Sequence, residues 1–166
     1  MSLFSYNPDT VDVLIAGFIP VKGFIDGTFI SIDKDVQPST AARTPDGTVA
    51  RVKNNDATYT IQCTLHNGSE SNDLLTKLWQ LDEISQGKAK FPLLLKDQSG
   101  TDLFFSTTSW IEQVPALVKS TSIDSRTWTI RSAFAVINIG GDGEVSSLLE
   151  DIANSVFSAA GGLGNV

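Results

Sequence analysis

Residues 57–65, with the sequence ATYTIQCTL, alternate between apolar and polar side chains along their whole length. Because successive side chains of a β-strand point to opposite faces, this period of two predicts a strand with one buried face and one wet face. It is the clearest strand signal in the sequence. We therefore expect the chain to build a sheet around this segment.

The segment that follows changes to a helical period. A turn is expected at Asn67-Gly68, and a serine just after it can cap a helix. Gly87 ends the pattern. Within it, leucines recur at helical spacing at Leu74, Leu75, Leu78 and Leu81. We expect a helix over about residues 71–86 that lays this leucine stripe on the sheet.

Composition limits the class of protein. The chain has 166 residues, 41% of them hydrophobic and 19% charged, which favours one folded domain with a single core. No apolar run approaches the length needed to cross a bilayer, so no membrane partner is expected. A net charge of −7 argues against a protein that grips phosphate backbones through a basic surface. Cys63, the single cysteine, excludes an intramolecular disulfide and fits a small buried apolar residue.

Further stretches have the composition or alternation of strands, bounded by glycine, proline or asparagine. They cover residues 11–20, 29–36, 49–54, 90–97, 102–114 and, with a bend near its start, about 120–139. In the last of them one face is predicted to carry Trp128, Ile130, Ser132, Phe134 and Val136. The expected fold is mainly β, a barrel or sandwich of two packed antiparallel sheets with one flanking helix over residues 1–141.

A polar stretch, residues 37–48, separates two of these strands. It contains the type I turn signature Thr44-Pro45-Asp46-Gly47. A dozen residues is long for a hairpin loop, and such loops are often functional. We expect residues 29–36 and 49–54 to pair as a long hairpin with this loop as its tip. In a register centred on the loop, Ser31, Asp33 and Asp35 oppose Arg51 and Lys53.

The C-terminal residues 142–166 are predicted to form a helical extension. Apolar side chains at i, i+3, i+4, i+7 and i+11 place one stripe on a helix over about residues 143–158: Val145, Leu148, Leu149, Ile152 and Val156. An apolar stripe alone does not identify the surface on which the helix packs. It could pack on the chain's own sheet, the simpler solution, or on a neighbouring subunit.

Candidate catalytic residues are few. His66 beside the expected turn has only Cys63 nearby, and Asp33 and Asp35 fit a solvated strand face better than a metal site. The glycines at 161, 162 and 164 precede no helix that could bind a phosphate. We expect no catalytic residue, metal or cofactor, and no enzyme activity. A monomeric barrel or sandwich that binds a small ligand or a carbohydrate stays open as an alternative.

Two segments carry a family resemblance, VDVLIAGFIPVKGFIDGTFISIDKD and RTWTIRSAFAVINIGG. Together with the order of elements and the Asp-Gly hairpin, they resemble the tail tube proteins of contractile-tailed bacteriophages over residues 9–141. The needle protein of type VI secretion shares the plan, but this sequence is more similar to the phage branch. The resemblance implies hexameric rings that stack into a tube, whose lumen conducts DNA from the capsid to the host.

The resemblance also implies partners and surfaces. The partners are other copies of the chain and the tail sheath, tape measure, baseplate and terminator proteins, in a virion tail assembled in the host cytoplasm. DNA is expected to pass through without specific binding. The expected lumen-facing residues are Ser31, Asp33, Asp35, Arg51 and Lys53. The expected inter-subunit or inter-ring loop contains Gln37, Arg43, Asp46 and Thr48, and the expected helix interface contains Leu148, Leu149, Ile152 and Val156.

Overall fold

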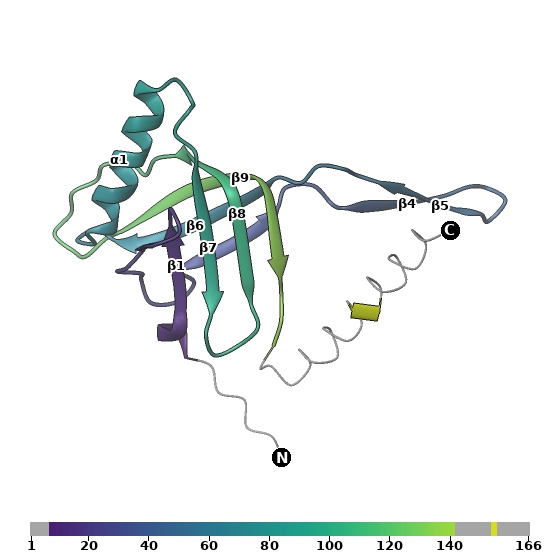
Figure 1. The fold of residues 1–166 in the computed structure, drawn as a ribbon, viewed down its shortest axis with the longest axis horizontal. Helices are drawn as coiled ribbons and strands as arrows, with labels where there is room; N and C mark the ends of the chain where they lie inside the picture. The colour runs from purple at the N-terminus through teal and green to yellow at the C-terminus, as the bar shows by residue number, and fades with distance from the viewer. Residues whose placement is uncertain (1–6, 142–153, 156–166) are drawn as a thin grey trace, which may run out of the picture.

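The computed structural model describes residues 7–141 and 154–155 and contains a seven-stranded sheet, a two-stranded sheet and one long helix (Figure 1). The strands are β1 Val11–Ile15, β2 Ile19–Pro20, β3 Ile30–Lys34, β4 Ser39–Arg43, β5 Val49–Lys53, β6 Tyr59–His66, β7 Phe91–Asp97, β8 Leu103–Gln113 and β9 Ser125–Asn138. The helix α1 is Ser71–Ile84. The predicted mainly β, antiparallel fold class is confirmed. The second sheet, however, is a projecting hairpin.

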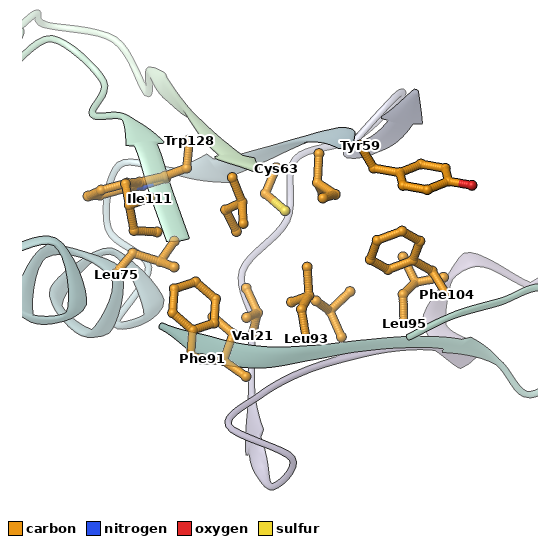
Figure 2. Packing of buried hydrophobic residues seen from close by; sticks show 14 of the residues in the cluster. Val21, Tyr59, Cys63, Leu75, Phe91, Leu93, Leu95, Phe104, Ile111 and Trp128 are labelled. Carbon is orange, nitrogen blue, oxygen red and sulfur yellow. The ribbon is translucent and has the colours of Figure 1, made fainter. Parts of the chain in front are cut away.

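The large sheet curls around one core. Its order is β2-β1-β7-β8-β9-β6-β3, and every neighbouring pair is antiparallel. Figure 2 shows Tyr59 and Cys63 of β6 on one side of the core, and the β7 side chains with Phe104 of β8 on the other. Tyr59 meets Phe104 edge to face, with 5.7 Å between ring centroids. The core is therefore enclosed largely by one sheet folded over on itself.

Strand β6 confirms the alternation expected of residues 57–65. Tyr59, Ile61, Cys63 and Leu65 are buried, and the residues between them are half-buried or exposed. Burial raises the pKa of the Cys63 thiol to about 12, because the thiolate would lose its hydration in the core. The cysteine therefore acts as a small apolar residue.

We expect Cys63 to be unreactive in the folded protein. At pH 8 the buried thiol carries almost no thiolate, whereas an exposed cysteine ionises near its ordinary pKa and reacts. A chromogenic disulfide reagent should therefore titrate one thiol in urea and almost none in buffer. Rapid stoichiometric labelling of the native protein would contradict this packing.

Helix α1 follows the predicted turn and lies at the opposite end of the body from β4 and β5 (Figure 1). Leu75 is fully buried, and Leu74 and Leu78 pack at the margin of the core. Leu81 is 54% exposed, so the prediction that the stripe packs along the whole helix is wrong at its last turn. The half-buried Trp79 packs against the core as well.

The predicted strand 11–20 is two strands in a tight hairpin. Ala16 and Gly17 have φ values of +56° and +82°, which turn the chain so that Ile15 pairs with Ile19. A run of apolar residues gives no warning of such a turn, because an alanine rarely adopts a positive φ.

The predicted pairing of residues 29–36 with 49–54 is wrong. Strand β3 pairs with β6, for example Asp33 with Thr60, and β4 pairs with β5. Backbone hydrogen bonds from Asp35 to Thr58 and from Asn54 to Pro38 continue the ladder between these pairs. Residues 30–66 therefore form one long hairpin, in which only 44–48 are the turn. Strand β4 is mostly exposed on both faces, so its sequence shows no hydrophobic alternation.

The predicted common face of the last strand also changes along β9. Trp128, Ile130 and Ser132 face the core, but Phe134 and Val136 are 60% and 54% exposed. The pairing of β8 with β9 shifts register between Phe105 and Ser109. Such bulges turn the following side chains to the opposite face. The second half of β9 therefore presents large apolar side chains to the outside.

Candidate assembly surfaces

Strands β4 and β5 form an arm, residues 39–53, that projects from the body (Figure 1). The predicted turn forms its tip. Gly47 donates to the Thr44 carbonyl at 2.9 Å, and Thr44 donates to the Thr48 carbonyl at 2.9 Å. The Asp46 carboxylate accepts hydrogen bonds from the Thr44 hydroxyl and from the Thr48 amide, which lower its pKa. The tip is therefore a structured turn at the signature expected from the sequence.

The arm has two chemically different faces. Paired residues share a face, so Arg51 lies with Ala41, and Arg43 and Lys53 lie on the same side two residues away along each strand. The opposite face carries Thr40, Ala42, Ala50 and Val52. Among residues 7–141 and 154–155, the three cations form no ion pair with the rest of the chain. The arm thus offers one basic and one small, mostly apolar surface to a partner.

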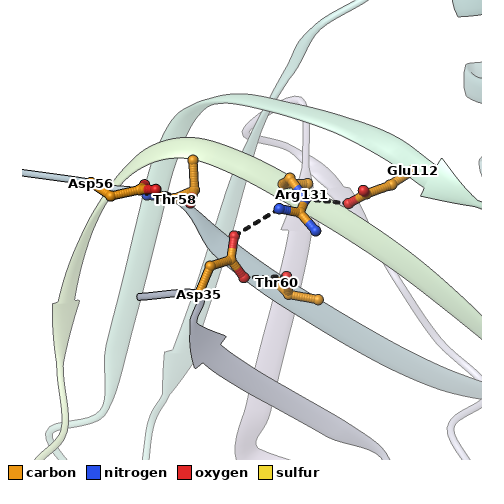
Figure 3. A network of polar contacts seen from close by, with 6 residues as sticks. All are labelled: Asp35, Asp56, Thr58, Thr60, Glu112 and Arg131. Atoms are coloured by element: carbon orange, nitrogen blue, oxygen red, sulfur yellow. Dashed lines mark hydrogen bonds and ion pairs between the residues drawn. The ribbon is translucent and has the colours of Figure 1, made fainter. Parts of the chain in front are cut away.

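Arg131 of β9 forms ion pairs at the base of the arm (Figure 3). Its guanidinium lies 2.9 Å from the Asp35 carboxylate and also binds Glu112, whose hydrogen bond raises the pKa of Arg131. Asp35 also accepts a hydrogen bond from Thr60. Because Asp35 directly follows β3, this cluster fixes the direction in which the chain leaves the sheet toward the arm.

The outward face of β3, β6 and the first half of β9 is polar, and we call it the polar half. Its cross-strand rows include Ser31 with Gln62 and Thr129, and Asp33 with Thr60 and Arg131. The Thr64 and Thr127 hydroxyls lie 3.1 Å apart. The sequence placed Ser31 and Asp33 correctly on an outward strand face.

The predicted site residues are only partly brought together. Ser31 and Asp33 lie on the polar half, Asp35 is bound at the base of the arm, and Arg51 and Lys53 are on the arm itself. The expected opposition of acids and bases across one hairpin is therefore wrong. Gln37 precedes β4, and Arg43, Asp46 and Thr48 lie at or beside the arm tip. Leu148, Leu149, Ile152 and Val156 lie outside the described residues.

Arg131 and Glu112 were not identified from the sequence. They lie on different strands and are far from Asp35 along the chain, so no local motif joins the three. The one available signal was an arginine next to the apolar Ile130, near the centre of a predicted strand. Its polar neighbours could be known only after the strand order was known.

The described part of the chain contains no group of three or more histidine, cysteine, aspartate or glutamate side chains that could hold a metal ion. None of the helices in that part is long and apolar enough to span a membrane.

A comparison with known sequences decides the family. No protein-family model matches the chain. Over 153 residues it is 31% identical to structural protein ORF10 of Pseudomonas phage KPP10, covering 89% of this chain and 88% of that protein. The chain belongs to this family of phage structural proteins. The resemblance to phage structural proteins seen in the sequence is thereby confirmed.

Solved structures share the fold of this phage structural protein at low sequence identity. A chain of the virion of a native gene transfer agent particle has a TM-score of 0.55 and 10% identity, covering 81% of this chain and all of the other. The tube-terminating cap of the anti-feeding prophage has a TM-score of 0.51 and 12% identity, and the match covers 83% of this chain and 93% of the other. A chain from a sheath-tube complex of an extracellular contractile injection system has a TM-score of 0.52 and 11% identity, and the match covers 81% of this chain and 91% of the other.

Proposed function

We propose that this phage structural protein is a subunit of the tail tube, forming hexameric rings that stack around a lumen through which DNA leaves the capsid. The arm is the observation that carries the proposal. A two-stranded ribbon alone is marginally stable, and neither face of this one packs on its own body. A long ordered arm is explained if it contacts another subunit or ring.

The polar half of the sheet is the proposed lumen lining. Hydroxyl and amide groups bind water well, and Asp33 adds negative charge, so the surface offers DNA phosphates little attraction. In contrast to the expectation from the sequence, Arg51 and Lys53 belong to the arm and are not proposed to line the lumen. The proposal includes contacts with sheath and terminator proteins, supported by the neighbours from a tube-terminating cap and from a sheath-tube complex. It also includes a place in a virion tail that is assembled in the host cytoplasm.

Electron microscopy of the purified protein tests the proposal. Stacked rings or tubes are expected, whereas single rings that never stack would instead indicate a tube-terminating role like that of the anti-feeding prophage cap. A stable monomer under all conditions tested would favour the ligand-binding alternative. A non-enzymatic structural role is part of the proposal, supported by the naming of the relative as a structural protein.

Lysines on the polar half should retain DNA. Replacing Asp33 and Gln62 with Lys adds two positive charges and removes one negative charge on a confined surface, a net change of about +3 that creates phosphate contacts. We expect particles built with this variant to release DNA more slowly, and the defect to shrink as salt is raised. The matched control is Gln80→Lys with Glu83→Lys on exposed positions of α1, which adds the same charge. Equal behaviour of the two variants would rule out a lumenal polar half.

A further inference from the structure

Four apolar side chains form a continuous row on the outward face of the sheet, beside the polar half. Leu14 pairs with Leu94, Leu94 with Phe105, and Phe105 with Val136, so the row crosses β1, β7, β8 and β9. Phe105 is 40% exposed, and Phe134, two residues from Val136 on the same face, is 60% exposed. We call these four residues together with Phe134 the apolar row.

The apolar row is not part of the core. Leu14, Leu94 and Phe105 each lie between two residues that are buried on the other face of the sheet, such as Leu93 and Leu95 on either side of Leu94. Phe134 and Val136 lie on either side of the buried Ala135. A contiguous exposed apolar surface normally marks an interaction site, because covering it removes it from water. Its confinement to one half of the outward face, with hydroxyls and amides on the other, gives this site a definite boundary.

The chain leaves β9 directly beside the apolar row and is held there. Thr101 in the β7–β8 turn donates to the Gly141 carbonyl at 3.1 Å, and Gly140 donates to the Asp102 carboxylate at 2.7 Å. The Asn138 amide donates to the Thr101 carbonyl at 2.6 Å. A Cβ on Gly140 would lie 1.7 Å from the Thr101 hydroxyl oxygen, so only glycine allows this close contact. The starting point of residues 142–166 is thus fixed against the end of the sheet.

We propose that residues 145–156 of the same chain cover the apolar row as an amphipathic helix. Their sequence supplies the stripe Val145, Leu148, Leu149, Ile152 and Val156. Glu150 and Asp151 fall on the opposite side of that helix. Asn154 and Ser155, which the structure describes, are helical. The stripe faces the sheet and the acids face water.

The dimensions agree with this placement. The row crosses three strand spacings of about 4.8 Å, roughly 14 Å, and twelve helical residues extend about 17 Å. The four residue steps from Gly141 to Val145 reach up to about 14 Å. Phe105 lies four residues beyond Thr101, about 13 Å along β8. The helix can therefore begin at the row without a strained connection.

The short connection between Gly141 and Val145 favours binding of the chain's own segment over the same segment of a second copy. A short connection gives an effective concentration in the millimolar range, far above that of a neighbouring subunit in dilute solution. The inference does not rest on a role in the tail tube, since the apolar row and the tethered segment belong to one monomer.

Paired cysteines test the contact. The full chain with Val136→Cys and Leu149→Cys, diluted and oxidised by copper phenanthroline, should form a disulfide within one chain, because both side chains face the same interface. The buried Cys63 stays out of the reaction. Under denaturing, non-reducing conditions the product should run at monomer mass with two thiols protected from a maleimide. Val136→Cys with Asp151→Cys is the matched control, expected to form the bond at least about tenfold more slowly, since Asp151 lies about 200° around the helix from Leu149.

Three results would overturn the proposal. A product of dimer mass would place the segment of a second copy on the row. Equal rates for the Leu149 and Asp151 pairs would show that no defined helix face is presented. A product that forms equally well from Thr129→Cys on the polar half with Leu149→Cys would show that the segment does not select the apolar row. Unchanged circular dichroism in each reduced variant verifies that the fold persists.

Discussion

Removal of the arm is expected to abolish tube formation while the body still folds. Asn54 already donates to the Pro38 carbonyl at 2.9 Å, so this pair can close a two-residue turn. Replacing residues 39–53 with Asn-Gly supplies the turn that such hairpins prefer. No residue of β4 or β5 belongs to the core, so the unfolding midpoint should change little. Sedimentation velocity should show rings or monomers at concentrations where the unmodified protein forms tubes.

Controls on the intact arm distinguish its two faces. Arg43→Ser, Arg51→Ser and Lys53→Ser together remove the basic face, and Val52→Ser with Ala50→Ser makes the other face polar. Assembly that fails only with the first set, and that weakens with salt in the unmodified protein, would identify an acidic partner surface. Full-length tubes from the arm-deleted protein would show that ring stacking depends on another surface.

The elements predicted well from the sequence are those with one buried and one wet face. Strand β6 and helix α1 each pack one side on the core, so their periodicities of two and 3.6 were visible in the letters. The end of α1 was less predictable, because Leu81 continues the stripe beyond the surface that α1 covers. Periodicity indicates which residues could be buried, and the length of the partner surface decides which are.

The arm and the second half of β9 were missed for two different reasons. Strand β4 is held by backbone hydrogen bonds with little burial, so nothing in its side chains marks it as a strand. In β9 the run Phe134-Ala135-Val136-Ile137 is apolar at every position. The sequence therefore does not show which alternate residues of this run face the core. The register shift between β8 and β9 near Ser132 and Phe134 makes Ala135 the buried member. One-residue changes of register reverse every following side chain.

The sequence showed which residues of a single strand face outward, but it did not show which residues of other strands lie beside them. The outward placement of Ser31 and Asp33 follows from alternation within β3 alone. Their partners on β6 and β9 depend on the strand order, as does the joining of Asp35 to Arg131. The same dependence produced the apolar row, because Leu14, Leu94 and Phe105 become neighbours only in the assembled sheet.

Asn72 is expected to be the most sensitive polar residue of the fold. Its side-chain oxygen accepts a hydrogen bond from the Trp128 indole nitrogen at 2.9 Å. Its amide donates to the carbonyls of His66 at 2.8 Å and Ser69 at 3.1 Å. Asn72 and Trp128 are only 3% and 2% exposed. One side chain thus joins the start of α1, the preceding turn and β9.

Asn72→Ala should lower the free energy of unfolding by about 2–4 kcal/mol, because each buried polar group left without a partner costs about 1–3 kcal/mol and water can reach some of them. Urea denaturation followed by tryptophan fluorescence measures the change. In Trp128→Phe the indole donor is absent, so adding Asn72→Ala to it should cost less than in the unmodified protein, by about 1 kcal/mol or more. Additive losses in this double-mutant cycle would show that the Asn72–Trp128 hydrogen bond does not couple the helix to the sheet.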